Sequence, residues 1–91
     1  MVGTRVYPNP DGSFRWLKRG EYIFVDGEWY ARVPDPRTND MDMSSLRGHV
    51  VVEHDDGTIT VSPSIGHHGR DENNQEVYWH GFLERGVWRE A

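Results

Sequence analysis

The chain has 91 residues, a formal net charge of −5 and no cysteine, and its four tryptophans, four tyrosines and three phenylalanines supply much of its bulky apolar surface. A chain of this length has room for one modest hydrophobic core, so residues 1–91 are expected to form a single domain. The lack of cysteine excludes disulfide frameworks and thiolate metal sites, the negative charge argues against binding to nucleic acid, and no apolar run approaches the ~20 residues of a membrane span; a cytoplasmic protein is therefore predicted.

The first third of the sequence consists of short strand-like runs separated by Gly and Asp. Residues 13–18 and 21–25 are predicted to pair as a hairpin, and residues 4–7 are a candidate edge strand. Asp26-Gly27 then separates residues 21–25 from residues 28–33. An Asp-Gly pair between two such runs predicts a type I′ hairpin turn, because that turn requires positive φ at both central residues.

The middle of the sequence contains a second hairpin signal. Residues 49–53 and 58–62 are rich in β-branched side chains and flank a turn that includes Asp56-Gly57. Before them, prolines at positions 34 and 36 end the preceding strand because proline cannot donate to a β-ladder. Residues 42–46 are expected to form one short helical turn.

The last third contains a polar segment followed by two strands. Residues 66–76 are polar and contain glycine, which predicts a long exposed loop. Residues 77–83 and 87–89 are predicted strands joined by a three-residue turn at 84–86. The sequence therefore predicts an all-β fold, a small antiparallel sandwich or open barrel built from consecutive hairpins, with at most one short helical turn.

Five histidines in a chain of this size raise the question of a metal site. His67, His68 and His80 are the candidate ligands, and zinc is the candidate metal, since it takes three or four ligands and accepts imidazole nitrogen. The alternative is a solvated His-His pair in a loop, with His80 in a structural hydrogen bond. On that interpretation no cofactor is expected.

The alternation of side chains along residues 77–83 leaves two interpretations open. If Trp79 and Leu83 face the core, then Tyr78, His80 and Phe82 form an exposed aromatic stripe, which is a typical binding surface. If the strand is central, both faces are buried. The first interpretation predicts a protein-binding site made of His67, His68, Arg70, Tyr78, His80 and Phe82.

Two further functions have weaker support in the sequence. Carboxylates concentrate in residues 34–76, which carry a net charge of −6, and an inhibitor that mimics nucleic acid would have such a charge. The residues concerned are Asp35, Asp40, Asp42, Asp55, Asp56, Asp71 and Glu72. Ser62, Ser64 and His80 are possible partners in acid–base catalysis, but the chain has no Gly-x-Ser-x-Gly elbow or His-Glu-x-x-His stretch, so a non-enzymatic protein is favoured.

The C-terminal 40 residues or so also resemble a family of small bacterial and phage proteins of unknown function. The resemblance lies in Ser62-Pro63-Ser64-Ile65, in Trp79-His80-Gly81-Phe82 and in Gly86-Val87-Trp88. It implies a phage or bacterial origin and no particular activity. Together with the predicted stripe, it suggests a protein that binds a host or defence-related protein. The candidate edge strand at residues 4–7 could pair between chains, so a monomer and a homodimer both stay open.

Overall fold

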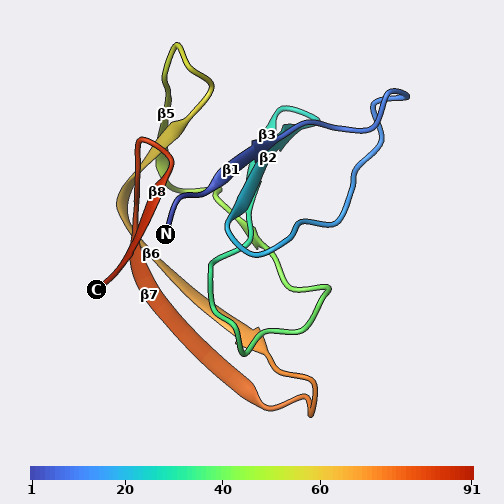
Figure 1. Cartoon of the computed structure of the whole chain (residues 1–91), viewed down its shortest axis with the longest axis vertical. Helices are drawn as coiled ribbons and strands as arrows, with labels where there is room; N and C mark the ends of the chain where they lie inside the picture. Colours follow the sequence, from blue (N-terminus) through green and yellow to red (C-terminus); the bar gives the residue numbers. More distant parts are fainter.

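The computed structural model describes residues 1–91 and contains eight strands in two sheets of four. The first sheet, in the order β1-β2-β3-β4, comprises β1 (Thr4–Val6), β2 (Glu21–Val25), β3 (Glu28–Ala31) and β4 (Ser44–Ser45). The second, in the order β5-β6-β7-β8, comprises β5 (Val50–Glu53), β6 (Ile59–Arg70), β7 (Glu76–Glu84) and β8 (Val87–Glu90). Figure 1 shows β6 and β7 as a long curved hairpin that extends past the first sheet. The predicted all-β fold is confirmed, and no helix is present that could span a membrane.

The main core lies between the two sheets. It contains ten buried side chains drawn from both sheets and the segments beside them, namely Tyr22, Ala31, Val33, Leu46, Ile59, Val61, Ile65, Trp79, Leu83 and Trp88. A second cluster of Val6, Leu17, Ile23 and Val25 lies on the opposite face of the first sheet, because neighbouring residues of a strand point to opposite faces. The first sheet is therefore covered on both faces, whereas the second sheet has an outer face toward solvent.

Local turn chemistry determines two of the hairpins. Asp26 and Gly27 have φ values of 54° and 77°, so the predicted type I′ turn between β2 and β3 is confirmed. Arg85 and Gly86 also both have positive φ, 46° and 76°. Glu84 pairs with Val87, so this turn has two residues rather than the three predicted, because the same type I′ geometry closes it.

Two predictions for the first half of the chain are wrong. Residues 13–18 are not a strand, and β2 pairs instead in parallel with β1. The 7–20 segment crosses the outer side of the first sheet and buries Leu17 there. The expected helical turn at 42–46 is replaced by β4, because the edge of β3 offers unpaired backbone groups to Ser44 and Ser45.

The prediction of a long exposed loop at residues 66–76 is also wrong. β6 continues through Arg70 and β7 begins at Glu76, which leaves only residues 71–75 as the turn. A polar run can remain in a ladder because its backbone bonds are made by the neighbouring strand while alternate side chains point to water. The turn closes with Asn74 at a φ of 61°.

Two arginines hold the 34–42 segment against the sheets. Arg19 donates to the backbone carbonyls of Asp35, Pro36 and Thr38, at 2.9 to 3.1 Å. Arg32, which is buried, donates to the carbonyls of Leu17 and Asn39. This segment has almost no regular structure of its own, so these guanidinium groups satisfy carbonyls that a ladder would otherwise satisfy.

Candidate functional site

The outer face of the second sheet carries the predicted stripe of Tyr78, His80 and Phe82. On β7, Trp79 and Leu83 are buried in the main core, whereas the side chain of Tyr78, on the opposite face of the strand, is 50% exposed. His80 is also exposed and Phe82 is half-buried. β7 therefore has one buried face, which carries Trp79 and Leu83, and one outward face, which carries the stripe. The two faces of the strand are not both buried.

The rings of the stripe lie in a row along β7. The ring centroids of Tyr78 and His80 are 6.4 Å apart, and those of His80 and Phe82 are 6.2 Å apart. His68, on the neighbouring β6, extends the row because its centroid lies 4.6 Å from that of Tyr78. These four side chains stand on paired strands, so a partner would meet a surface whose backbone is already ordered.

A hydrogen bond between β7 and β6 fixes the centre of the stripe. His80 Nε2 lies 2.8 Å from Ser64 Oγ. Ser64 is itself held through its carbonyl, which lies 3.1 Å from His49 Nε2. The orientation of the His80 ring is therefore set by a residue of β6 that is in turn tied to the segment before β5.

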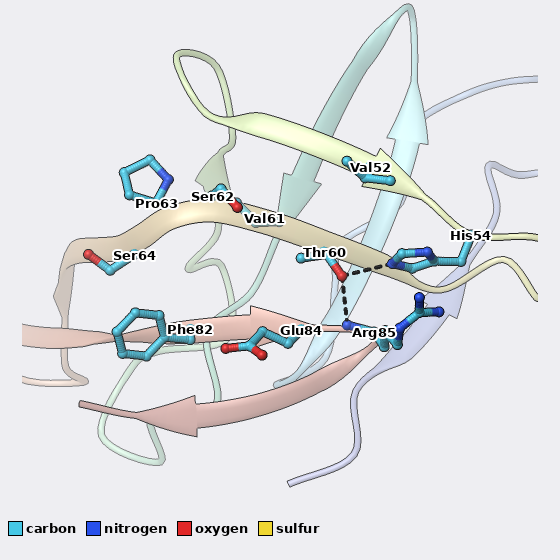
Figure 2. A pocket seen from close by; sticks show the side chains of 10 residues that line it. All are labelled: Val52, His54, Thr60, Val61, Ser62, Pro63, Ser64, Phe82, Glu84 and Arg85. Carbon is cyan, nitrogen blue, oxygen red and sulfur yellow. Dashed lines mark hydrogen bonds between the residues drawn. The ribbon is translucent and has the colours of Figure 1, made fainter.

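A groove of about 830 Å³ lies beside the stripe on the same outer face. It arises because β6 has two more residues than β7 between the pairs Val61 with Leu83 and Ile65 with Gly81. Figure 2 shows Val52 on one side of the groove and Phe82 on the other, with β6 between them. The groove is lined by Val52, His54, Thr60, Val61, Ser62, Pro63, Ser64, Phe82, Glu84 and Arg85.

One end of the groove is polar and ordered by hydrogen bonds. Thr60 Oγ1 lies 2.7 Å from His54 Nε2 and accepts a bond from the Arg85 backbone N–H at 2.9 Å (Figure 2). The other end has the apolar ring of Phe82 beside the hydroxyl of Ser64. A ligand segment with an apolar side chain and nearby hydrogen-bonding groups fits this combination.

The charged groups around the stripe are mostly paired with one another. Arg89 lies over the Phe82 ring, 4.4 Å from its centroid, and donates to Glu84 at 3.0 Å. At the other end, His68 Nδ1 lies 2.8 Å from the carboxylate of Glu76. The outer face therefore presents aromatic surface between an ion pair at one end and a histidine–carboxylate hydrogen bond at the other.

The backbone of the stripe is anchored from the 34–42 segment. Arg37 donates to the Tyr78 carbonyl at 2.9 Å and to both carboxylate oxygens of Asp35. The hydrogen bond from Arg37 lowers the pKa of Asp35 below its ordinary value, and the Arg37 backbone N–H acts in the same direction. The Asp35 carboxyl is almost completely buried, and burial alone would raise its pKa, but the bonds from Arg37 outweigh that effect, so the carboxylate remains ionised while it orients Arg37 toward β7.

The structure separates the three histidines that were candidate zinc ligands. His67 points inward, where its Nε2 lies 2.9 Å from an Asp42 carboxylate oxygen, while His68 and His80 point outward from their strands. No group of three or more His, Cys, Asp or Glu side chains converges anywhere in the chain. The alternation along β6 explains the separation, because adjacent residues of a strand face opposite sides.

The other predicted binding residues are placed unequally. His68, Tyr78, His80 and Phe82 come together on the outer face. Arg70 is exposed at the end of β6, where its guanidinium lies 3.4 Å from the Asn74 carbonyl. His67 lies on the opposite face and does not belong to the same surface.

Sequence reasoning missed two features. The groove depends on the register shift in β6, for which Pro63 inside a β-branched strand was the available signal, since proline within a strand often marks a bulge. A second exposed aromatic cluster joins Phe14, Trp16 and Tyr30, with ring centroids 5.8 and 5.9 Å apart. It lies on the side of the first sheet that the 7–20 segment covers.

Comparisons with protein-family models, with curated proteins and with solved structures found no match to this chain.

Proposed function

We propose that this protein is a small non-enzymatic binding domain that recognises another protein through the outer face of its second sheet. The observation that carries the proposal is the row of Tyr78, His80 and Phe82 on a paired strand, turned to solvent beside an 830 Å³ groove. Aromatic side chains in such a position contribute large contact areas at low entropic cost, which makes them typical hot spots of protein interfaces.

The chemistry of this face indicates what the partner presents. Glu84 forms an ion pair with Arg89, and the Glu76 carboxylate lies within hydrogen-bond distance of His68 Nδ1, so both carboxylates already have partners on this face. The partner surface is therefore mainly apolar, with one or more groups that hydrogen-bond to His80 or to the hydroxyls of the groove. On the resemblance of the C-terminal residues to bacterial and phage proteins, we place the domain in the cytoplasm with a host or defence-related protein as its partner.

The geometry gives less support to nucleic-acid mimicry. Asp35 and Asp42 are largely buried and bonded to Arg37 and His67. The remaining carboxylates lie in separate turns, with Asp55 before β6 and Asp71 after it. Mimicry of a phosphate backbone would require carboxylates arrayed on one surface.

A binding experiment with matched variants tests the proposal. The intact protein, immobilised at a surface tag, is used to recover partners from a bacterial lysate and is compared with the double variant Tyr78→Ala, Phe82→Ala. Trp16→Ala serves as the control, because it removes an exposed aromatic ring from the 7–20 segment, away from the stripe. The proposal predicts a partner whose recovery falls at least about tenfold in the double variant only. Equal recovery by both, or loss in the control, would contradict it.

The contact between Ser64 and His80 supports a second candidate, a serine hydrolase. A serine and a histidine 2.8 Å apart at the end of a groove satisfy the first geometric requirement of nucleophilic catalysis. The His80 ring is flanked by Tyr78 and Phe82, and a triad would place a carboxylate there. Treatment with a fluorophosphonate followed by mass spectrometry distinguishes the two: labelling that Ser64→Ala abolishes would establish the hydrolase, and an unlabelled protein would leave the binding function.

A further inference from the structure

The four sheet edges of this protein differ in how well they are protected. The outer edge of β8 is covered by the N-terminal residues, since Val2 bridges Val87 and the Trp88 N–H donates to the Met1 carbonyl at 2.8 Å. β4 has two residues and β1 has three. β5 (Val50–Glu53) is longer, pairs only with β6 and contains three valines. It has none of the lysines, prolines or bulges that commonly prevent edge-to-edge pairing.

The hydrogen-bond pattern shows which backbone groups of β5 are unpaired. The His54 N–H donates to the Thr58 carbonyl at 2.8 Å, and β5 pairs with β6 in the same register, with Val52 opposite Thr60. Because bonded and non-bonded pairs alternate along an antiparallel ladder, Val50, Val52 and His54 direct their backbone groups to β6. The N–H and C=O groups of Val51 and Glu53 therefore point away from the sheet.

Apolar surface borders this edge on both faces of the sheet. On the outer face, Val50 is 65% and Val52 is 49% exposed. On the inner face, Val51 borders a groove of about 280 Å³ that Trp29 and Leu46 also line. An additional strand beside β5 would cover apolar surface on both sides while its backbone satisfied the outward groups of Val51 and Glu53.

We infer that β5 is a self-association edge, at which two copies of the chain pair antiparallel about a two-fold axis through Val52. In this register Val51 of each copy exchanges backbone hydrogen bonds with Glu53 of the other, so every outward group of the edge finds a partner. Val52 then lies opposite Val52 of the second copy. The four hydrogen bonds and the valine pair form an isologous contact, as a two-fold axis requires.

Charge complementarity at the ends of β5 favours a second copy over an unrelated strand. Because the two strands run antiparallel, the turn before β5 in one copy, which holds Arg47, lies at the same end of the contact as the turn after β5 in the other copy, which holds Asp55 and Asp56. Arg47 and Asp56 are exposed, Arg47 also pairs with Glu28 of its own chain, and the two-fold axis brings the two turns together at both ends. Opposite charges thus meet at both ends of a contact whose centre is apolar.

Self-association of this kind joins the two second sheets into one sheet of eight strands. Its order is β8-β7-β6-β5-β5-β6-β7-β8, and the outer faces of both copies lie on the same side. The two β7 strands are then five strand spacings apart, about 24 Å at ~4.8 Å per strand. Two aromatic stripes would face one partner surface, although the association itself does not depend on the proposed function.

Cysteine substitution tests the contact and its register, because the chain contains no cysteine of its own. At Val52→Cys the two thiols face each other across a non-hydrogen-bonded pair, where Cα atoms are ~4.5 Å apart and a disulfide can form. In Val50→Cys the two thiols lie far apart, because in this register residue 50 of one copy is opposite residue 54 of the other. Val87→Cys is the matched control, an exposed valine on β8. Rapid oxidation to a covalent dimer is expected for Val52→Cys alone.

Sedimentation of the full chain supplies the second measurement. From about 10 µM to about 1 mM, the average mass is expected to rise from that of one chain toward that of two. Glu53→Pro removes an outward N–H and Val52→Lys places two ammonium groups opposite each other, so both should abolish the rise, whereas Val87→Lys should not. A chain that stays monomeric throughout, a dimer that survives both variants, or equal oxidation of Val50→Cys and Val52→Cys would overturn the inference.

Discussion

Gly81 offers a test of the packing beneath the aromatic stripe. It lies on the core-facing side of β7, opposite Glu90 of β8, and its φ is not in the left-handed region. A Cβ at this position would overlap the carbonyl oxygen of Arg89 and the indole of Trp79. Both obstacles are rigid, because one is backbone and the other is a buried ring packed against Trp88 at a centroid distance of 5.6 Å.

The expected cost of Gly81→Ala follows from two opposing terms. Forcing a methyl group into a packed core costs about 1–3 kcal/mol. Replacing glycine in a strand recovers about 0.5–1 kcal/mol, because the unfolded chain loses conformational freedom. The net loss in free energy of unfolding is therefore about 1–2 kcal/mol, which for a domain of this size lowers Tm by roughly 5–15 °C.

Gly66→Ala is the matched control in the same hairpin. Its Cβ would point to the outer face and meet only the Tyr78 hydroxyl, at 2.7 Å, which is the end of an exposed side chain that can move. Thermal unfolding followed by tryptophan fluorescence should show a Tm that is unchanged or slightly higher. Equal Tm values for Gly81→Ala and wild type, or equal losses at both glycines, would refute the assignment of the two faces of β7.

Three further substitutions probe other contacts. Asp35→Asn should lower the free energy of unfolding at pH 7 by about 1–3 kcal/mol, because it weakens the bonds to Arg37. Folding lowers the pKa of Asp35, so the stability advantage of the wild type is complete above the ordinary pKa of an aspartate and disappears as the pH falls through the lower pKa of the folded state. Urea titrations between pH 7 and about pH 2 would show this loss. Trp88→Phe should cost about 0.5–1.5 kcal/mol in the same assay, because the Gly20 carbonyl loses the indole N–H that donates to it at 3.0 Å and keeps only the Thr4 backbone N–H. Gly27→Ala should cost about 1–2 kcal/mol by chemical denaturation, since its φ of 77° is unfavourable for alanine although the space around it is open. If the backbone conformation is the cause, Gly27→Asn should lower the free energy of unfolding less than Gly27→Ala does. An equal loss for the two variants would argue against a conformational cause.

The placement of the candidate site shows where sequence reasoning succeeds and where it stops. The alternation of Tyr78, His80 and Phe82 with Trp79 and Leu83 is fixed by the period of a strand. Which set is buried depends on which face of β7 the first sheet covers, and that is a contact between distant segments. The pairing of His67 with Asp42, 25 residues away, arises in the same way.

The sequence by itself determined the all-β class and the type I′ turn at Asp26-Gly27, because strand period and turn φ are set by residues next to one another. Only the tertiary structure decided that β1 pairs with β2, that β6 runs through Arg70, and that β6 gains two residues opposite Phe82. These features are pairings between segments whose backbone groups are chemically alike, so the choice among them depends on which arrangement buries the aromatic side chains and leaves the fewest backbone groups unpaired.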